Sequence, residues 1–406
     1  MFQNVGCEKD GDFSMNVVFF THDLDNAGSQ KVLVNLANGF VRQGYTVEIV
    51  AMLATGLLRS ELDRDILVVD LQANALTVVP RLVQYLRHRR PEVMLAFYNA
   101  FTLFPLVAQR ISGVPVRVIP TVHTMVTNIL QESPIPMLRL AYRLTLAVWR
   151  RAPIIVAVSE TVATDLTKYH IPRDRIRVIY NPVLNREFDQ RREELLEDSW
   201  IHAVNSNIPI VIGVGRLCHQ KNFEALIRSF TIIRKNSKDA KLILVGDGPN
   251  RAALEQLVTQ LRIQDDVHFA GHVNNPLPFM ERAHVLVLSS RYEGLGLVAV
   301  EALAVGTPVV GYANLPLKEI AVPSGMMHLV TPGDEAMLAC SILETMSLKA
   351  RKPLMVDLTS QFGEPAVVEQ YAALLSTKSG RGSHGTPDTT KAARNILHGA
   401  QQTNGS

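Results

Sequence analysis

Short apolar runs alternate with amphipathic stretches along most of the chain. The first run, VVFF, is followed by a stretch at 29–43 in which apolar residues recur at helical spacing. Runs that are apolar at consecutive positions are typical of parallel strands buried on both faces, and their alternation with helices predicts a doubly wound α/β sheet. The strands expected in this first sheet are Val17–Phe20, Val47–Ala51, Leu67–Val69, Val93–Ala96, Val116–Ile119 and Ile154–Val158.

The same alternation starts again after a polar interval at 191–207, which we interpret as a linker between two domains. A second α/β domain is therefore expected over 208–360, with helices at 222–235, 250–262 and 297–305. Its expected strands are Ile210–Val214, Leu242–Val245, Val267–Phe269, Val285–Leu288 and Val309–Val310.

The two ends of the chain differ from this pattern. Residues 1–14 contain acids and no continuous apolar run, so they are expected to form a loose extension before a first domain at 15–190. One more amphipathic helix is expected at 361–377. Residues 378–406 are rich in Gly, Ser, Thr, Asn and Gln, which predicts a disordered tail.

Composition and charge restrict the class of protein. A net charge of +3 over 406 residues gives no indication of nucleic-acid binding, and no run reaches the length of a membrane span. Cys7, Cys218 and Cys340 have no metal-binding spacing, which indicates free thiols in a reducing compartment, the cytoplasm. Residues 80–177 carry 14 Lys or Arg against 5 Asp or Glu. This local excess is either a solvated helical face or a surface that meets phosphate or an anionic membrane.

Within this basic region, residues 136–152 predict one helix with an apolar stripe beside several arginines. Two interpretations stay open: a core helix of the first domain, or an interfacial helix on the inner face of an anionic membrane. The stripe consists of Leu138, Tyr142, Leu146 and Trp149, and the arginines are Arg139, Arg143, Arg150 and Arg151.

The segment 289–311, SSRYEGLGLVAVEALAVGTPVVG, follows an expected strand directly and holds the most specific chemical pattern. Two glutamates lie eight residues apart, and two glycines between them allow the backbone to approach a ligand closely. A helix that begins after the second glycine offers free N–H groups, which bind phosphate or hydroxyl groups, and carboxylates accept several hydrogen bonds from sugar hydroxyls. The residues of this predicted site are Glu293, Gly294, Gly296, Leu297, Val298 and Glu301.

This segment resembles the E-x7-E signature of glycosyltransferase family 4, the group 1 retaining glycosyltransferases. The resemblance extends over about residues 16–376 and implies the α/β GT-B architecture, in which two Rossmann-like, doubly wound parallel-sheet domains face each other across a cleft. It also implies that the helix at 361–377 packs back on the first domain.

The resemblance implies roles for further residues. IGVGRLCHQK at 212–221 is similar to the family's diphosphate-binding segment, so Arg216 and Lys221 are expected to stabilise the leaving diphosphate without a metal. His123 is expected to face the donor sugar. In AGSQKV at 27–32, one glycine of the family's pair is kept and the other is Ala27. The remaining donor-binding residues expected from the resemblance are Gly28, Gly215, Gly271, His272 and Val273.

The family resemblance implies transfer of a hexose or N-acetylhexosamine, with retention, from a nucleotide diphosphate sugar. UDP is the favoured nucleotide, and the acceptor is a glycan or lipid-linked molecule of cell-surface polysaccharide or glycolipid biosynthesis. No metal is expected, because Asp63 and Asp65 lie in a charged surface stretch, and no dinucleotide cofactor is expected, because no GxGxxG follows a strand. The alternatives are a nucleotide-sugar epimerase or phosphorylase on the same fold, or a non-catalytic nucleotide-sugar-binding subunit. The expected catalytic residues are His123, Arg216, Lys221 and Glu293.

Overall fold

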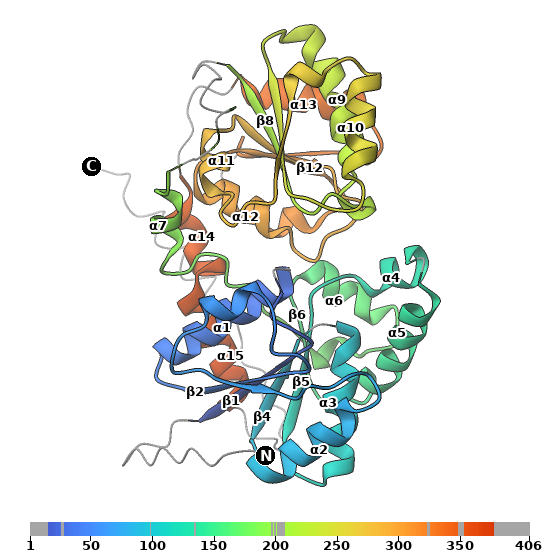
Figure 1. Ribbon diagram of the computed structural model, residues 1–406, viewed down its shortest axis with the longest axis vertical. Helices are drawn as coiled ribbons and strands as arrows, with labels where there is room; N and C mark the ends of the chain where they lie inside the picture. Colours follow the sequence, from blue (N-terminus) through green and yellow to red (C-terminus); the bar gives the residue numbers. More distant parts are fainter. Residues whose placement is uncertain are drawn as a thin grey trace, which may run out of the picture. The chain divides into compact units, whose positions relative to one another are not determined.

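The described part of the chain forms two parallel β-sheets, each covered by helices (Figure 1). The chain divides into two compact units, one that ends at Gln370 and one that begins at Tyr371. Of the second unit, the structure describes only residues 371–376, the end of a helix. The doubly wound α/β class expected from the sequence is confirmed. The computed structural model describes residues 15–25, 28–97, 99–133, 135–195, 198, 200, 208–322, 325–347 and 353–376.

The first sheet has seven strands in the order β3-β2-β1-β4-β5-β6-β7, all parallel. The chain runs outward from β1 to β3, crosses to β4 and then runs outward in the opposite direction. The order therefore reverses between β1 and β4, and ligands of such sheets bind at the carboxyl ends of the strands at this point. The strands are β1 (Asn16–Thr21), β2 (Thr46–Ala51), β3 (Leu67–Asp70), β4 (Val93–Ala96), β5 (Arg117–Val122), β6 (Ile155–Ala157) and β7 (Ile176–Val178).

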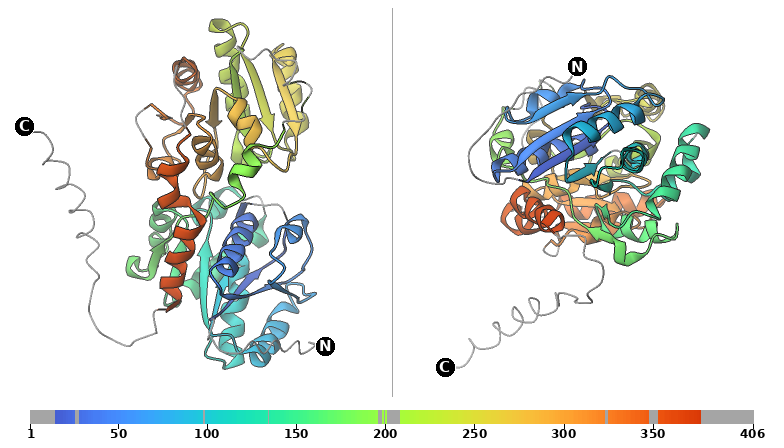
Figure 2. Two further views of the ribbon diagram at one scale, coloured as in Figure 1. Left: turned by 90° about the vertical axis from the view of Figure 1, so that its left-hand side faces the viewer. Right: turned by 90° about the horizontal axis from the view of Figure 1, so that it is seen from below.

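Helices cover both faces of this sheet (Figure 2). Because crossovers between parallel strands are right-handed, α1 lies on one face and α2 and α3 lie on the other. Phe19 of β1 points toward α1 and packs against Phe40, with ring centroids 6.0 Å apart. The helices are α1 (Gly28–Arg42), α2 (Val78–Arg89), α3 (Leu103–Ser112), α4 (Val126–Glu132), α5 (Pro136–Trp149) and α6 (Glu160–Thr167), with 3-10 turns η1 (Leu57–Glu61), η2 (Asn99–Thr102) and η3 (Arg173–Arg175).

The second sheet has six parallel strands in the order β10-β9-β8-β11-β12-β13, which reverses between β8 and β11. Its strands are β8 (Ile210–Val214), β9 (Lys241–Val245), β10 (Val267–Gly271), β11 (Val285–Leu288), β12 (Val309–Tyr312) and β13 (Met327–Val330). Its helices are α9 (Phe223–Asn236), α10 (Arg251–Gln260), α11 (Leu277–Arg282), α12 (Leu297–Ala304) and α13 (Glu335–Met346), with 3-10 turns η4 (His219–Lys221), η5 (Gln264–Asp266) and η6 (Pro316–Glu319).

Two further segments connect the sheets. The short helix α7 (Phe188–Arg192) follows the first sheet, and α14 (Met355–Phe362) and α15 (Glu364–Ser376) follow the second. The backbone N–H groups of Val183 and Leu184 both donate to the carbonyl of Phe362, so the two connections run side by side. The start of α15 lies on α1, because Arg42 forms an ion pair with Glu364.

The structure corrects the sequence interpretation at four places. Strand β5 extends to Val122 rather than ending at Ile119, so His123 follows it directly. The strands β7 and β13 were not predicted. The helix expected at 361–377 is divided at Gly363, where the backbone is extended between α14 and α15. The expected extension at 1–14, the tail at 378–406 and most of the expected linker at 191–207 lie outside the described residues.

Candidate functional site

The carboxyl ends of β8 and β11 lie side by side at the reversal point of the second sheet, and a cavity of about 610 Å³ opens there. Its lining combines the end of β8 and the start of α12 with residues of α1 and η1 from the first sheet. A concave site at this position is where an open α/β sheet binds its ligands. The predicted donor-binding residues that line the cavity are Gly28, Gly215, Arg216, His272, Val273, Leu297, Val298 and Glu301.

Glycine is required at the end of β8 for conformation and for space. Gly215 has a φ of +147°, which disfavours any side chain, and a Cβ placed on it would lie 3.0 Å from Cε of Lys221. Gly246, after β9, packs backbone to backbone on Gly215, since its Cβ would lie 2.1 Å from the Gly215 carbonyl oxygen. The Lys221 side chain therefore packs directly against the backbone of Gly215. Gly271, which does not line the cavity, fixes the neighbouring Gly246 by accepting a hydrogen bond from its N–H.

Lys221 and Glu293 form an ion pair that joins the loops after β8 and β11. The Lys221 ammonium lies 2.6 Å from Oε1 of Glu293, and the Ser290 hydroxyl donates to the same oxygen at 2.6 Å. The Glu293 side chain is buried. Backbone contacts fix the same junction, because the N–H of Arg291 donates to the carbonyl of Gln220. The structure thus brings together two residues that lie 72 positions apart and that the sequence predicted separately.

Helix α12 begins at this junction without a side-chain cap. Its N-cap is Gly296, which has a left-handed backbone with a φ of +87°. Without a capping side chain, the first N–H groups of the helix remain available to a ligand. Glu301 lies one turn further into the helix and lines the cavity.

Two basic side chains, Lys31 of α1 and Arg191 of α7, act on the charge of Glu301. Burial raises the pKa of the Glu301 carboxyl, and the positive charges of Arg191 and Lys31 oppose this increase. Both basic residues line the cavity, and Lys31 also pairs with Glu61. The sequence analysis missed Arg191 and Lys31, because each lies in a polar stretch whose position relative to α12 depends on the folded chain.

The loop of Glu293 lies against the end of strand β5. A Cβ placed on Gly294 would lie 2.0 Å from the carbonyl oxygen of His123, and the Gly294 carbonyl accepts a hydrogen bond from the Ser159 hydroxyl at 2.6 Å. These contacts connect the second sheet to the first at the residue expected to face the donor sugar. The predicted site residues His123, Lys221, Glu293, Gly294 and Gly296 are not among the residues that line the 610 Å³ cavity.

The protonation of His123 follows from its surroundings. The backbone N–H of His123 donates to the side-chain oxygen of Asn99, and the centroid of its ring lies 5.1 Å from that of Phe97. Burial lowers the pKa of His123 to about 3, so the imidazole is neutral near pH 7. The Thr121 hydroxyl donates to the carbonyl of Ala96 and therefore accepts from Nε2 of His123, 3.1 Å away. On this geometry we assign the proton to Nε2, which leaves Nδ1 as the acceptor atom of the ring.

The end of β1 carries a polar pair that the sequence analysis did not identify. Nδ1 of His22 lies 2.5 Å from a carboxylate oxygen of Asp23, and the Gln30 amide donates to the other oxygen at 2.9 Å. These residues stand at the reversal point of the first sheet. Their position directly after the VVFF strand is the signal that could have revealed them.

Asp63 and Asp65, which do not line the cavity, form a turn. A carboxylate oxygen of Asp63 accepts the N–H of Asp65, as in a turn. Among the residues that the structure describes, no group of three or more His, Cys, Asp or Glu could hold a metal ion.

Helix α5 is a core helix of the first domain. Trp149 is fully buried and its indole N–H donates to the Thr102 hydroxyl at 2.8 Å, while Tyr142 and Leu146 are also buried. The interpretation in which these side chains rest on a membrane is therefore wrong. The exposed face of α5 carries a different apolar row, formed by Met137, Leu140 and Leu144 with Ile135 just before the helix. No helix within the described ranges is long and apolar enough to cross a bilayer.

Two family models match the chain, one over strands β2 to β7 of the first sheet and the other over all six strands of the second. The model of glycosyltransferase family 4 matches residues 27–184, and the model of group 1 glycosyl transferases matches residues 196–361. The second match contains Lys221, Glu293 and Glu301, and the first contains Gly28 and His123.

Individual relatives agree with these matches. An uncharacterised glycosyltransferase of Methanocaldococcus jannaschii is 36% identical over 161 residues, which is 38% of this chain and 41% of that protein. The N-acetyl-alpha-D-glucosaminyl L-malate synthase of Bacillus anthracis is 25% identical over 276 residues, 66% of this chain and 69% of that protein. The crystal structure of HepE from Anabaena in complex with UDP and glucose superposes with a TM-score of 0.71 at 19% identity, covering 90% of this chain and 100% of that one.

Proposed function

The chain belongs to the group 1 glycosyltransferases of family 4 and has their GT-B fold, and on this premise we propose that it transfers a sugar from a nucleotide diphosphate sugar to a glycan or lipid-linked acceptor. The sugar is a hexose or N-acetylhexosamine. UDP is the favoured nucleotide, supported by the UDP in the complex of the structural relative HepE. The observation that carries the proposal is the Lys221–Glu293 pair, which joins the loops after β8 and β11 just before the uncapped start of α12.

In this proposal, different residues bind the charged groups and the hydroxyl groups of the donor. The diphosphate is placed at Arg216 and Lys221, whose positive charges stabilise the negative charge that develops as the glycosidic bond breaks. Lys221 has three N–H donors, so it can hold Glu293 and a phosphate oxygen together. Glu301 accepts hydrogen bonds from the ribose hydroxyls, and Glu293 accepts from the sugar. Backbone N–H groups of Leu297 and Val298 complete the site.

Transfer with retention is proposed from the family resemblance. The acceptor oxygen attacks the anomeric carbon on the face from which the diphosphate departs, the bond from that carbon to the diphosphate breaks, and a diphosphate oxygen takes the acceptor proton. Glu293 is not assigned as a covalent nucleophile, since both Lys221 and Ser290 already bind its Oε1 atom. Neutral His123 lies next to Gly294 and contributes a hydrogen bond rather than a charge.

Contact with an anionic membrane surface is proposed through the outer face of α5. Met137 is 73% exposed, Leu140 50% and Leu144 52%, and the sequence of the helix contains arginines and no acid. An exposed apolar row beside basic side chains suits the boundary of an anionic leaflet. The double variant Leu140→Ser/Leu144→Ser and the charge reversal Arg139→Glu/Arg143→Glu should each reduce flotation with anionic vesicles. Unchanged flotation in both variants would refute the contact.

Product analysis tests the proposed transfer against its rivals. The protein is incubated with UDP- and GDP-sugars, with and without a lipid extract as acceptor, and the products are followed by NMR. Transfer predicts free nucleoside diphosphate together with a new glycosidic bond of the donor's anomeric configuration. An epimerase would isomerise the donor without acceptor, a phosphorylase would need inorganic phosphate, and a non-catalytic subunit would leave every donor intact.

A further inference from the structure

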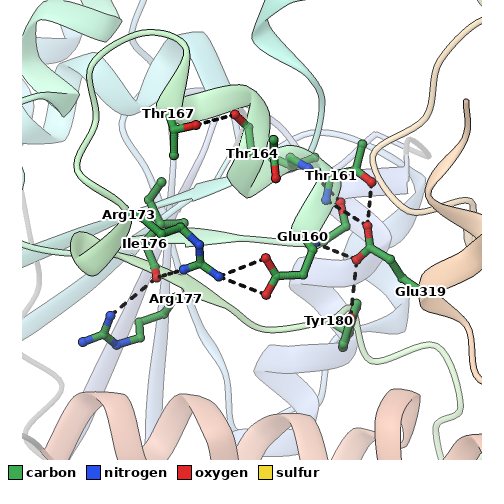
Figure 3. Close-up of polar contacts among 11 residues, drawn as sticks. Glu160, Thr161, Thr164, Thr167, Arg173, Ile176, Arg177, Tyr180 and Glu319 are labelled. Atoms are coloured by element: carbon green, nitrogen blue, oxygen red, sulfur yellow. Dashed lines mark hydrogen bonds and ion pairs between the residues drawn. The ribbon is translucent and has the colours of Figure 1, made fainter. Parts of the chain in front are cut away.

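A carboxylate from the second sheet occupies the N-terminus of a helix of the first sheet (Figure 3). One oxygen of Glu319 accepts the backbone N–H of Glu160 at 2.6 Å. The other accepts the N–H of Thr161 at 2.8 Å and its hydroxyl at 2.6 Å. Glu319 thus supplies the cap that the first turn of α6 would otherwise take from its own segment or from water.

A further hydrogen bond joins the N-terminus of α6 to the second sheet. Ser159, the N-cap, accepts the N–H of Val162 and donates its own proton to the carbonyl of Gly294. The side chain of Glu160 is turned away to Arg173, with both carboxylate oxygens within 3.0 Å of one guanidinium nitrogen, so it does not repel Glu319 (Figure 3). The first three N–H groups of the helix are therefore satisfied, two of them from the second sheet.

Glu319 is rigidly connected to the candidate donor site. It ends the 3-10 turn η6, in which Leu317 is fully buried and packs against the glycines at 296 and 311. The carbonyl of Glu319 also accepts a hydrogen bond from Gln361 at 2.7 Å. Its carboxylate is further approached by the hydroxyl of Tyr180, at 3.4 Å. The same turn that holds Glu319 therefore supports Gly296, where α12 begins.

We propose that Glu319 is a positioning residue that binds the N-terminus of α6 and thereby holds the Gly294 loop against His123. A carboxylate is favoured at this place because a helix N-terminus carries a partial positive charge and free N–H groups. Because the proposed contacts to the nucleotide and the diphosphate, other than Gly28, come from the second sheet, the contact acts on the alignment of His123 with the donor sugar rather than on donor affinity. The kinetic part of this proposal rests on the proposed glycosyl transfer, and its structural part does not.

The structural part is tested by hydrogen–deuterium exchange of the amides of Glu160 and Thr161. In Glu319→Ala these amides lose their acceptors, and we expect exchange to accelerate by about tenfold or more, the factor that corresponds to the loss of one charge-assisted hydrogen bond. Glu319→Gln keeps one acceptor oxygen and should give an intermediate increase. Thr164→Val, one turn further along α6, is the matched control and should change neither amide.

The kinetic part is tested with the same variants. For Glu319→Ala we expect kcat to fall by about tenfold while the donor Kd stays within about twofold of the wild type. Thr161→Val removes the hydroxyl contact alone and should lower kcat less. Unchanged exchange at Glu160 and Thr161 in Glu319→Ala would overturn the proposed contact. Equal losses of donor affinity and kcat would overturn its positioning role. If the wild type transfers no sugar, the exchange result still decides whether Glu319 binds α6.

Discussion

The backbone of Gly294 lies so close to His123 that no side chain fits between them, since a Cβ on Gly294 would lie 2.0 Å from the His123 carbonyl oxygen. Real Cβ atoms do not approach a backbone oxygen to this distance, so a larger residue must displace the loop that carries Glu293. The two sheets therefore meet by direct backbone contact at the place where the donor sugar is proposed to lie.

Gly294→Ala should separate this contact while leaving both sheets folded. We expect kcat to fall by about a hundredfold, because a displacement of about 1 Å in a reacting site has effects of this size. Gly333→Ala is the control for loss of a glycine without a clash, since the added Cβ has no neighbour within 4 Å there, and Gly333, unlike Gly294, has a positive φ. Steady-state transfer assays and thermal unfolding measure the effects. Activity of Gly294→Ala within about twofold of the control would contradict the importance of this contact.

Lys221→Met should remove the ammonium that is assigned to the diphosphate. We expect kcat to fall by about a hundredfold or more, as when one preorganised donor to a developing negative charge is lost. Breaking an ion pair can itself reduce stability, so Lys241→Met serves as the matched control. Lys241 pairs with Asp266 at 2.7 Å in the same sheet, away from the cavity. A similar loss of kcat in both variants would show that Lys221 acts only through stability.

His123 should remain neutral throughout the physiological pH range, because burial lowers its pKa to about 3. Protonation of His123 then occurs only in acid, and kcat should show no ionisation of this residue near pH 6.5. Nitrogen-15 NMR should report a neutral ring with the proton on Nε2. A His123→Asn variant should leave the shape of the pH profile unchanged and lower its height. A midpoint near 6.5 for His123, seen in wild-type spectra, would contradict this assignment.

Glu301→Gln should have opposite effects on the free protein and on donor binding. Because burial raises the native pKa of Glu301, the native state binds more protons than the unfolded state at pH values between the two pKa values, and stability falls as pH rises through that window. The variant lacks this penalty, so its stability relative to wild type should be greater at pH 7 than at pH 4. Its donor affinity should be lower. Thermal unfolding at both pH values, with and without donor, measures both effects.

Most strands could be predicted because they are buried on both faces and are apolar at every position. The strands β7 and β13 escaped prediction because both are short and a basic residue, Arg177 or His328, interrupts each apolar run. Their position at an edge does not explain this, since the edge strands β3 and β10 were predicted. Arg177 in β7 and Leu329 in β13 are exposed, and neither strand is a continuous buried run. The end of β5 was predicted too early because Pro120 and Thr121 interrupt the apolar pattern, although both are buried.

The candidate site was predictable where its residues are adjacent in sequence. The loop from Glu293 to Glu301 is local, and its glycines and carboxylates could be identified from their spacing. Lys221 was identified through the family resemblance, but its pairing with Glu293 was not. Arg191 and Glu319 were missed because they reach their positions only through the packing of separate elements. A similar limit applied to α5, where the sequence suggested an apolar stripe but not which of its two apolar faces would be buried.

Donor binding tests the central claim most directly. Nucleotide diphosphate sugars are screened by thermal shift in the absence of metal, with Arg216→Ala and Glu301→Ala as site variants and Arg228→Ala, whose side chain pairs with Glu224 on the surface of α9, as the control. A ligand at about 100 times its Kd stabilises a fold by about 2.7 kcal/mol. The account predicts a selective shift with one UDP- or GDP-sugar that both site variants lose and the control keeps. A well-folded protein that shifts with none of these sugars, or whose shift survives in both site variants, would contradict it.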